Sequence, residues 1–312
     1  MMLALLLAAL PVIFWNQGPE TAVALKENGI EQVLVPVERL QAWKSTGLVV
    51  RGITTAEWSA LEEALAPGVD RQVQVASATR SPYLIANGWR FIRSRSAKYR
   101  YSLPAGKAAL AAAEAYAYGA DAALQIETTD LESAVKMLVF LRGLPAADLP
   151  GVSDLAVVDD QHPLAGEVMN LLARRNLLFA AVNAPDSRYP INIRIGSKEY
   201  SEDDASDPNA FALKIRRQLT DERRSVRIYG SETVLCRLTG DDTRIRLHLL
   251  NYRGGKVDGL RIRLLGAFRK GQARSEQIGE IPLENFAVSN GATEFSIPVM
   301  NLYAVIDLQR EK

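Results

Sequence analysis

Acidic residues close two consecutive apolar runs near the middle of the chain, and they are the residues best suited to chemistry. Glu127 ends the run Asp121–Glu127, and Asp159 with Asp160 ends the run Asp154–Asp160. Short apolar runs between helical patterns indicate buried parallel strands, which present functional groups at their carboxyl ends. Because neighbouring strands lie about 4.8 Å apart, we expect these carboxyl groups to lie roughly 5 Å from each other. That separation suits a nucleophile and an acid/base in retaining hydrolysis of a glycosidic bond.

A structural role is the alternative for these acids, because acidic residues at strand ends often cap the next helix. Asp160 stands just before Pro163, where a helical pattern begins. Strand alternation points Asp159 and Asp160 in different directions, and the pattern does not tell which one faces inward. We expect Glu127 and Asp160 to be the catalytic pair, with Asp159 as a binding residue.

Strand-like runs and helical patterns alternate through the first three quarters of the chain. The expected strands are Pro11–Gln17, Glu31–Pro36, Leu48–Ile53, Arg71–Ala76, Asp121–Glu127, Asp154–Asp160, Leu177–Val182 and Ser225–Tyr229. Eight strand–helix repeats in roughly 230 residues indicate a (β/α)8 barrel of the TIM type, and a doubly wound open sheet is the alternative. From Glu232 onward, strand patterns follow one another without helices, as in a small antiparallel β-sandwich. We therefore expect a barrel over residues 11–231 and a β-sandwich over residues 232–312.

A basic and aromatic insertion, residues 77–106, interrupts the alternation after the fourth expected strand. Its runs Trp89–Arg93 and Lys98–Ser102 predict a β-hairpin, and the insertion contains no acidic residue. Such a mixture of cations and rings can bind single-stranded nucleic acid or stack on sugar rings. The alternative is a flap with one face packed on the barrel.

Other candidate binding residues lie at the expected strand ends or in this insertion. They are Trp15, Asn16, Arg51, Arg80, Trp89, Asp159, Asn183 and Tyr229. Trp15 stands beside two amide side chains at a strand end, so we expect either a ring that stacks on substrate or a core residue.

Composition excludes several other classes of protein. The chain has 312 residues and a net charge of +1, so it has no bulk attraction for nucleic acid or anionic membranes. Cys236 is the single cysteine, which excludes an internal disulfide and a Cys-rich metal site, and its apolar surroundings predict a buried thiol. With only His162 and His248, and without HExxH, CxxC, P-loop or GxSxG patterns, we expect no metal and no cofactor.

The first ten residues resemble the apolar core of a secretory signal, although they lack a positive n-region and a clean cleavage site. The run is too short to span a bilayer, which takes about 20 apolar residues. We expect a remnant of a signal peptide and an extracytoplasmic protein, or a cytoplasmic one if this run is a buried segment. No stable membrane insertion is expected.

Three short motifs resemble the clan of glycoside hydrolases in which a (β/α)8 barrel precedes a C-terminal β-sandwich. They are Phe14–Asn16 at a first strand, Ala115–Asp121 before a central strand, and Arg246–Tyr252, which is similar to the "hLvNY" strand after many such barrels. The resemblance implies an oligo- or polysaccharide ligand at the mouth of the barrel.

The catalytic residues of that clan cannot be carried over to this chain. The clan places its acid/base after strand four, often as Asn-Glu, and its nucleophilic glutamate after strand seven. Here the corresponding segments are Val75–Ala78 and Val182–Asp186. We expect either a glycoside hydrolase-like enzyme that uses Glu127 and Asp160, or a hydrolase-shaped protein that binds carbohydrate or has a structural role without turnover. Nucleic-acid binding through Arg80–Tyr101 is a third possibility.

Overall fold

The computed structural model describes residues 10–70 and 83–311. The chain forms two compact units: the first unit is Met1–Gly68 with Ser94–Asp148, and the second unit is Val69–Arg93 with Leu149–Lys312. The expected strand Arg71–Ala76 and the candidate Arg80 lie outside the described residues, as does nearly all of the apolar N-terminal run. No helix in the described part of the chain is long and apolar enough to cross a bilayer.

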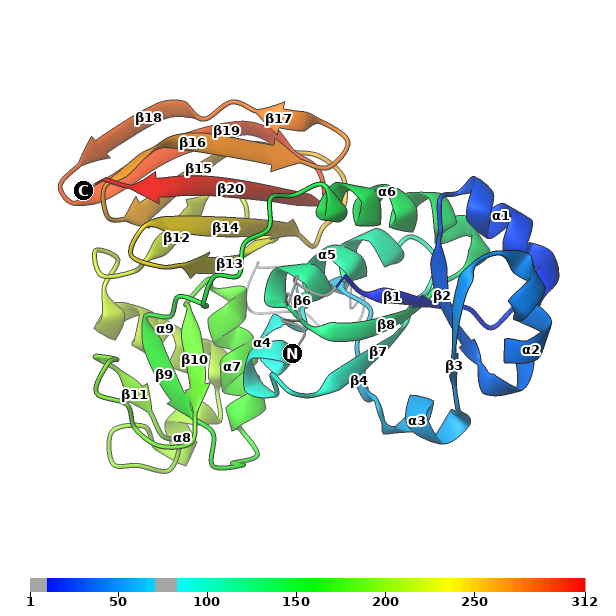
Figure 1. The fold of residues 1–312 in the computed structure, drawn as a ribbon. Coiled ribbons are helices and arrows are strands. Elements are labelled where there is room, and N and C mark those ends of the chain that lie inside the picture. The colour runs from blue at the N-terminus through cyan, green and yellow to red at the C-terminus, as the bar shows by residue number, and fades with distance from the viewer. Residues whose placement is uncertain (1–9, 71–82, 312) are drawn as a thin grey trace, which may run out of the picture. The chain divides into compact units, whose positions relative to one another are not determined.

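The first unit is built on a six-stranded parallel sheet in the order β3-β2-β1-β8-β7-β4 (Figure 1). Its strands are β1 (Val12–Phe14), β2 (Gln32–Pro36), β3 (Val49–Ile53), β4 (Glu62–Ala64), β7 (Lys98–Ser102) and β8 (Asp121–Gln125). Its α-helices are α1 (Ala22–Glu27), α2 (Leu40–Trp43), α3 (Thr55–Ala60), α5 (Ala108–Tyr118) and α6 (Leu131–Arg142). The Ala-rich α5 is buried along nearly its whole length, because small side chains let its backbone approach the neighbouring elements closely.

The hairpin expected in the basic insertion is wrong. Gly88–Arg93 forms the helix α4, and Lys98–Ser102 is the parallel strand β7 between β4 and β8. Trp89, Phe91 and Ile92 are all buried, so this short helix is apolar on most sides and shows no helical period in its sequence. Such a run cannot be told from a strand by periodicity alone.

The second unit contains a smaller parallel sheet in the order β10-β9-β11. Its strands are β9 (Leu155–Val158), β10 (Phe179–Val182) and β11 (Asn192–Ile193), and its helices are α4, α7 (Ala165–Arg174), α8 (Glu202–Ala205) and α9 (Pro208–Leu219). Helix α4 packs against α7, where a Cβ on Gly166 would lie 3.1 Å from the Trp89 ring. Glycine at that position lets the two helices approach closely.

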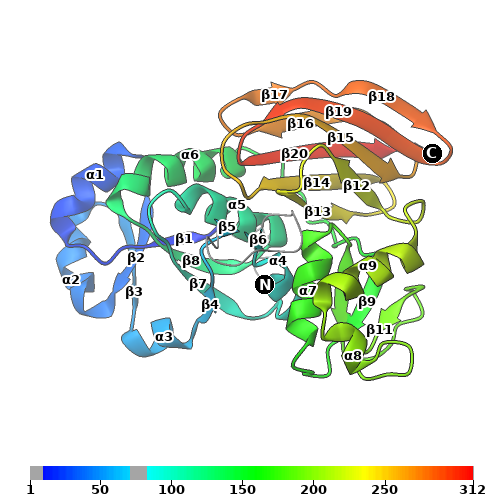
Figure 2. The same ribbon diagram turned by 180° about the vertical axis from the view of Figure 1, so that it is seen from behind.

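The second unit also contains the strand β6 (Tyr83–Ile85), which pairs with β5 (Gly68–Asp70), and two larger antiparallel sheets (Figure 2). One has the order β12-β15-β19-β18 and the other β13-β14-β20-β16-β17. The strands are β12 (Val226–Tyr229), β13 (Val234–Gly240), β14 (Arg244–Asn251), β15 (Val257–Leu265), β16 (Phe268–Ser275), β17 (Gly279–Ile281), β18 (Glu284–Ser289), β19 (Ala292–Met300) and β20 (Tyr303–Arg310). Leu247 and Ile306 of one sheet and Ile262 and Phe295 of the other belong to one hydrophobic core. After Glu232 strands follow one another without helices, as the sequence predicts.

The eighth expected barrel strand has a different place. Ser225–Tyr229 contains β12, which pairs antiparallel with β15, with Val226 opposite Leu264. No helix separates it from β13, which belongs to the other antiparallel sheet, so the strand–helix alternation ends before β12.

The fold class is a mixed α/β protein with parallel sheets followed by antiparallel ones, as the sequence predicts. Among the described residues, however, the parallel strands form sheets of six and three strands and not one closed ring of eight. The boundary at residues 231/232 stays a prediction.

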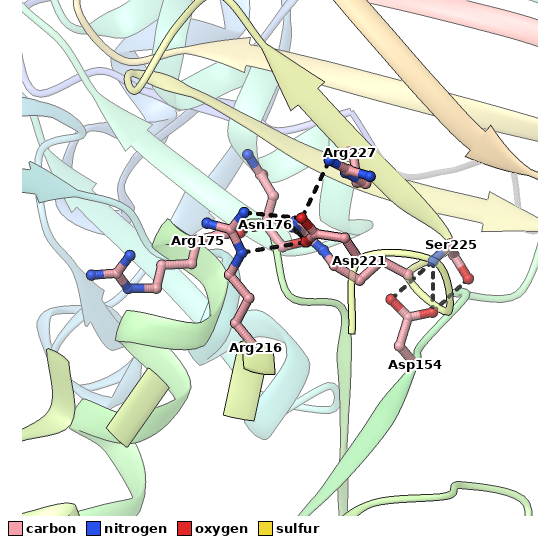
Figure 3. Close-up of polar contacts among 8 residues, drawn as sticks. Asp154, Arg175, Asn176, Arg216, Asp221, Ser225 and Arg227 are labelled. Carbon is pink, nitrogen blue, oxygen red and sulfur yellow. Dashed lines mark hydrogen bonds and ion pairs between the residues drawn. The ribbon is translucent and has the colours of Figure 1, made fainter. Parts of the chain in front are cut away.

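Side chains of the α/β part of the second unit bind the backbone of its antiparallel part. Asp154, at the start of β9, accepts hydrogen bonds from the backbone N–H of Ser225 at 3.1 Å and from its hydroxyl at 2.5 Å (Figure 3). Asn176 has a φ of 52° and binds β13 with both ends of its amide, donating to the Val234 carbonyl at 3.0 Å and accepting from the Cys236 N–H at 2.8 Å.

Two further sets of hydrogen bonds join the α/β part of the second unit to its antiparallel part. The buried Arg224 donates to the carbonyls of Arg175 and Asn176 at 3.3 Å and 3.2 Å, and so caps the carboxyl end of α7. The segment Pro150–Val152 runs along β13 through backbone bonds to Leu238 and Gly240. These hydrogen bonds hold the α/β part and the antiparallel part of the second unit together.

Candidate functional site

The carboxyl edge of the six-stranded sheet carries two of the predicted site residues. Strands β1 and β8 pair in register as far as Phe14 and Gln125, so Asn16 and Glu127 each follow two residues later. Both side chains are exposed. Beside them, Gln17 Nε2 donates a hydrogen bond of 2.8 Å to Thr128 Oγ1 and ties the two strand ends together. This edge offers one carboxylate and neighbouring amide groups to a ligand.

Two other predicted residues of the first unit are placed differently. Trp15 is only 1% exposed, and its indole Nε1 donates to Thr21 Oγ1 at 2.9 Å, so the ring is part of the core. Of its two expected roles, stacking on a substrate is therefore excluded by burial. Arg51 is exposed, but it lies in the middle of β3, level with Leu34, and not at the strand end.

The carboxyl edge of β9 brings Asp159 and Asp160 next to two arginines. Arg93 of α4 donates to both oxygens of Asp159, from Nε at 2.7 Å and Nη2 at 2.9 Å, which is the bidentate geometry of a strong charge-assisted pair. Arg194, just after β11, donates from Nε to Asp160 at 3.3 Å. Sequence reasoning missed both arginines as partners, because 66 and 34 residues separate them from the aspartates.

The remaining predicted residues of the second unit do not share one place. Trp89 is buried in α4, with the Arg90 guanidinium 4.5 Å from the centre of its ring. Asn183 is exposed directly after β10, at the same sheet edge as Asp159. Tyr229 is 38% exposed at the end of β12 in the antiparallel part, with the Arg227 guanidinium 4.9 Å from its ring centre.

The pairing of strands removes the argument that placed Glu127 beside Asp160. Strand β8 pairs with β1 and β7, whereas β9 pairs with β10 and β11. The spacing of about 4.8 Å between neighbouring strands therefore does not apply to these two carboxylates. The catalytic pair stays a prediction.

Cys236 and His248, two residues of types often used in nucleophilic or acid–base chemistry, are buried. Cys236 is 5% exposed, and burial raises the pKa of its thiol to about 12. His248 is also 5% exposed, and its Nδ1 lies 2.6 Å from the Tyr303 hydroxyl. Burial, followed by the charges of Arg246 and Arg237, lowers the pKa of His248 to about 3. Within the described ranges, no group of three His, Cys, Asp or Glu side chains could hold a metal ion.

Comparison with known proteins shows which solved structures have a similar fold. No protein-family model and no curated protein matches the chain. Among solved structures, it is similar to α-L-fucosidase isoenzyme 2 from Paenibacillus thiaminolyticus, with a TM-score of 0.56 and 9% identity over 88% of this chain and 70% of that enzyme. The fold of this chain is thus similar to that of a glycoside hydrolase, the fucosidase. The resemblance expected from the sequence is thereby confirmed as a likeness of fold.

A second solved structure, the rhamnosidase from Novosphingobium sp. PP1Y, has 10% identity over 94% of this chain and 38% of that one. Its TM-score is 0.46, so the assignment of the fold rests on the fucosidase.

Proposed function

We propose that this protein binds an oligo- or polysaccharide at the carboxyl ends of its parallel strands. The observation that carries the proposal is the fold shared with the fucosidase over 88% of the chain. Folds of this kind host many functions, so the exposed polar groups at the strand ends must supply the recognition. Asn16 in the first unit and, separately, Asn183 in the second unit provide exposed amide donors and acceptors suited to sugar hydroxyls. The apolar residues 1–10 support an extracytoplasmic location, where such polymers occur.

Hydrolysis by Glu127 and Asp160 is the first form of this proposal. Glu127 is exposed at its strand end, and its side chain makes no capping hydrogen bond to the turn Thr128–Asp130 that follows. A retaining mechanism needs the two carboxyl groups about 5 Å apart, and an inverting mechanism needs roughly 6.5–9.5 Å. In the retaining mechanism one carboxylate would attack the anomeric carbon while the other residue, as a carboxylic acid, protonates the leaving oxygen, and water would then hydrolyse the glycosyl–enzyme ester. In the inverting mechanism the carboxylate would instead take a proton from the attacking water.

Binding without turnover is the second form, and the ion pairs of the second unit favour it. Arg93 occupies both oxygens of Asp159, and Arg194 contacts Asp160. Carboxylates engaged in this way are positioned as structural anions more than as proton donors. In this form the fold keeps its carbohydrate site and lacks the acid needed for cleavage.

A panel of plant, bacterial and animal glycans separates the two forms, with binding and release of reducing sugar measured on the same samples. The hydrolytic form expects Glu127→Gln and Asp160→Asn each to abolish release while binding persists. The binding form expects no release by the wild type and weaker binding in the Asn16→Ala and Asn183→Ala variants. Glu31→Gln, an exposed change before β2 at the opposite end of the strands, is the matched control. Absence of both binding and cleavage across the panel would reject the proposal.

A further inference from the structure

The six-stranded sheet of the first unit has one buried face and one accessible face. Tyr101 and Leu124 point to the buried face, along which α5 lies (Figure 1), and the Tyr101 hydroxyl donates to Glu114 of α5 at 2.8 Å. Side chains alternate along a strand, so Arg100 and Gln125 point to the other face, and both are half-buried. We call the side that carries Arg100 and Gln125 the open face. Parallel sheets usually have both faces covered, so an accessible one is available to a ligand.

One aromatic ring is presented on the open face. Trp58 lies in α3, which begins directly after β3 at a capping box made by Thr54 and Glu57. The Trp58 ring stacks on Phe14, the last residue of β1, with 4.0 Å between the ring centres and 23° between the planes. Phe14 is buried, whereas Trp58 is half-buried. The stack fixes the orientation of the indole and leaves part of its surface accessible.

Arg100 of β7 brings unpaired donors close to this ring. Its guanidinium carbon lies 5.8 Å from the centre of the Trp58 ring, near the outer limit of a cation–π contact. Its Nη2 lies 3.6 Å from the Glu63 carboxylate, which is too long for a hydrogen bond, and its buried Nε has no hydrogen-bond partner. The Arg100 side chain is 24% exposed. Because a guanidinium has five N–H donors, Arg100 can donate to a ligand that lies beside the Trp58 ring.

Polar groups continue the open face toward the carboxyl edge of the sheet. Gln125 of β8 lies directly beside Phe14 of β1 in the strand pairing, and Ser102 of β7 flanks it on the other side. Glu127 follows Gln125 by two residues in an extended backbone, with φ −79° and ψ 153°, so it lies on the same face. Strands β1 and β7 flank β8, so the indole, the amide and the guanidinium span about 10 Å of one face.

We propose that the open face binds a neutral, β-1,4-linked saccharide whose rings carry equatorial hydroxyls, with Trp58 as the platform for one ring and Arg100 and Gln125 as partners of its hydroxyls. This site rests on the proposed function and specifies its ligand. A ring with equatorial hydroxyls presents C–H groups on its faces and oxygens around its rim. The indole covers such a face, while the donors beside it reach the rim. Glu63 lies close enough to balance the charge of Arg100, which favours a neutral sugar over an anion.

Quenching of fluorescence by iodide, at ionic strength held constant with sodium chloride, tests the site through Trp58. The chain has four tryptophans, and Trp15, Trp43 and Trp89 are at most 8% exposed. Trp58 is therefore the indole that iodide reaches in the native protein, and Trp58→Phe should remove most of the quenching. The probes are cellohexaose, xylohexaose, mannohexaose and chitohexaose. We expect at least one of them to bind in calorimetric titration and to protect the wild type from iodide.

The affinity of variants for the bound hexasaccharide tests each contact. We expect Trp58→Ala to bind about tenfold more weakly, because the ring platform is lost. Trp58→Phe keeps a ring on Phe14 and should lose less, which separates loss of stacking on the sugar from loss of the fold. Arg100→Met keeps the length of the side chain without its donors, and we expect about fivefold weaker binding. Ser59→Ala is the matched control, because Ser59 is the exposed neighbour of Trp58 on α3.

Two results would overturn the site on the open face. One is a hexasaccharide that binds without protecting Trp58 from iodide and with equal affinity for Trp58→Ala, Arg100→Met and Ser59→Ala. The other is absence of binding by all four probes. In either case, another glycan whose binding is weakened by Asn16→Ala or Asn183→Ala would keep the proposed function and reject the open face alone. Absence of binding by these probes and by the broader glycan panel would reject both.

Discussion

Asp130 provides the sharpest test of how the first unit is held together. It is 4% exposed, and its carboxylate accepts hydrogen bonds from the backbone N–H groups of Gly106 at 2.7 Å, Lys107 at 3.2 Å and Ala108 at 3.2 Å. These are the first donors of α5, whose own N-cap residue Lys107 supplies no side-chain bond. An acid from the start of α6 therefore caps a helix more than twenty residues before it.

The cost of Asp130→Ala follows from those three bonds. Loss of an N-cap costs about 1 kcal/mol. The Ala108 N–H is buried and would lose its partner, which costs a further 1–3 kcal/mol or so, whereas water can reach the partly buried Gly106 and Lys107. We expect the free energy of unfolding of the wild type to fall by about 2–4 kcal/mol in this variant.

Urea unfolding followed by far-ultraviolet circular dichroism measures this difference. Asp121→Ala is the control, because Asp121 is exposed and its ion pair with Lys98 is long, at 3.8 Å, so removal changes stability by less than about 0.5 kcal/mol. A change for Asp130→Ala within about 0.5 kcal/mol of that control would refute the remote cap.

Three further predictions concern the second unit. Asn176→Ala is expected to lower the free energy of unfolding by about 2 kcal/mol, because it removes the hydrogen bonds to Val234 and Cys236 and leaves alanine at a φ of 52°. Urea unfolding measures this change, and an unchanged unfolding midpoint contradicts the prediction. Folded His248 has a pKa of about 3 against 6.5 when unfolded, so wild-type stability is expected to fall as the pH drops below 6.5, by up to about 1.4 kcal/mol per pH unit. His248→Gln, which keeps a polar partner for Tyr303, should flatten this slope in unfolding curves between about pH 4 and pH 7, and an identical slope contradicts the assignment. The Cys236 thiol, with a pKa of about 12, should not react with a chromogenic disulfide reagent until urea unfolds the protein, and rapid labelling of the native state contradicts its burial.

Local pattern was enough to find most strands and insufficient to pair them. The runs that became β2, β8 and β9 are each apolar and bounded by turn or capping residues, so their type and limits were readable. Partner choice depends on contacts between distant segments, and the run of Ser225–Tyr229 looks the same whether its neighbour is parallel or antiparallel. For that reason β12 was assigned to the parallel part although it belongs to an antiparallel sheet.

At the candidate site, too, features set by the local sequence were predictable and contacts between distant segments were not. The positions of Asn16 and Glu127 at strand ends followed from the apolar runs, whereas the pairing of their strands, β1 with β8, was not predicted. The bidentate bond between Arg93 and Asp159 was not predicted either, because Arg93 lies in a segment whose helix was misread as a strand. Trp15 illustrates a third case, because the burial of this strand-end ring and its hydrogen bond to Thr21 do not follow from the strand pattern.

The contacts along β13 also bear on how the folded protein avoids self-association. Strand β13 is the outermost strand of its sheet, where unpaired N–H and C=O groups can recruit a strand from another molecule. Here the side chain of Asn176 occupies one stretch of that border, and Pro150–Val152 occupies another by bonding to Leu238 at 2.9 Å and Gly240 at 2.8 Å. A chain cut after residue 231 to isolate the antiparallel part would lose both covers. Such a fragment is expected to aggregate through β13 even if its core folds.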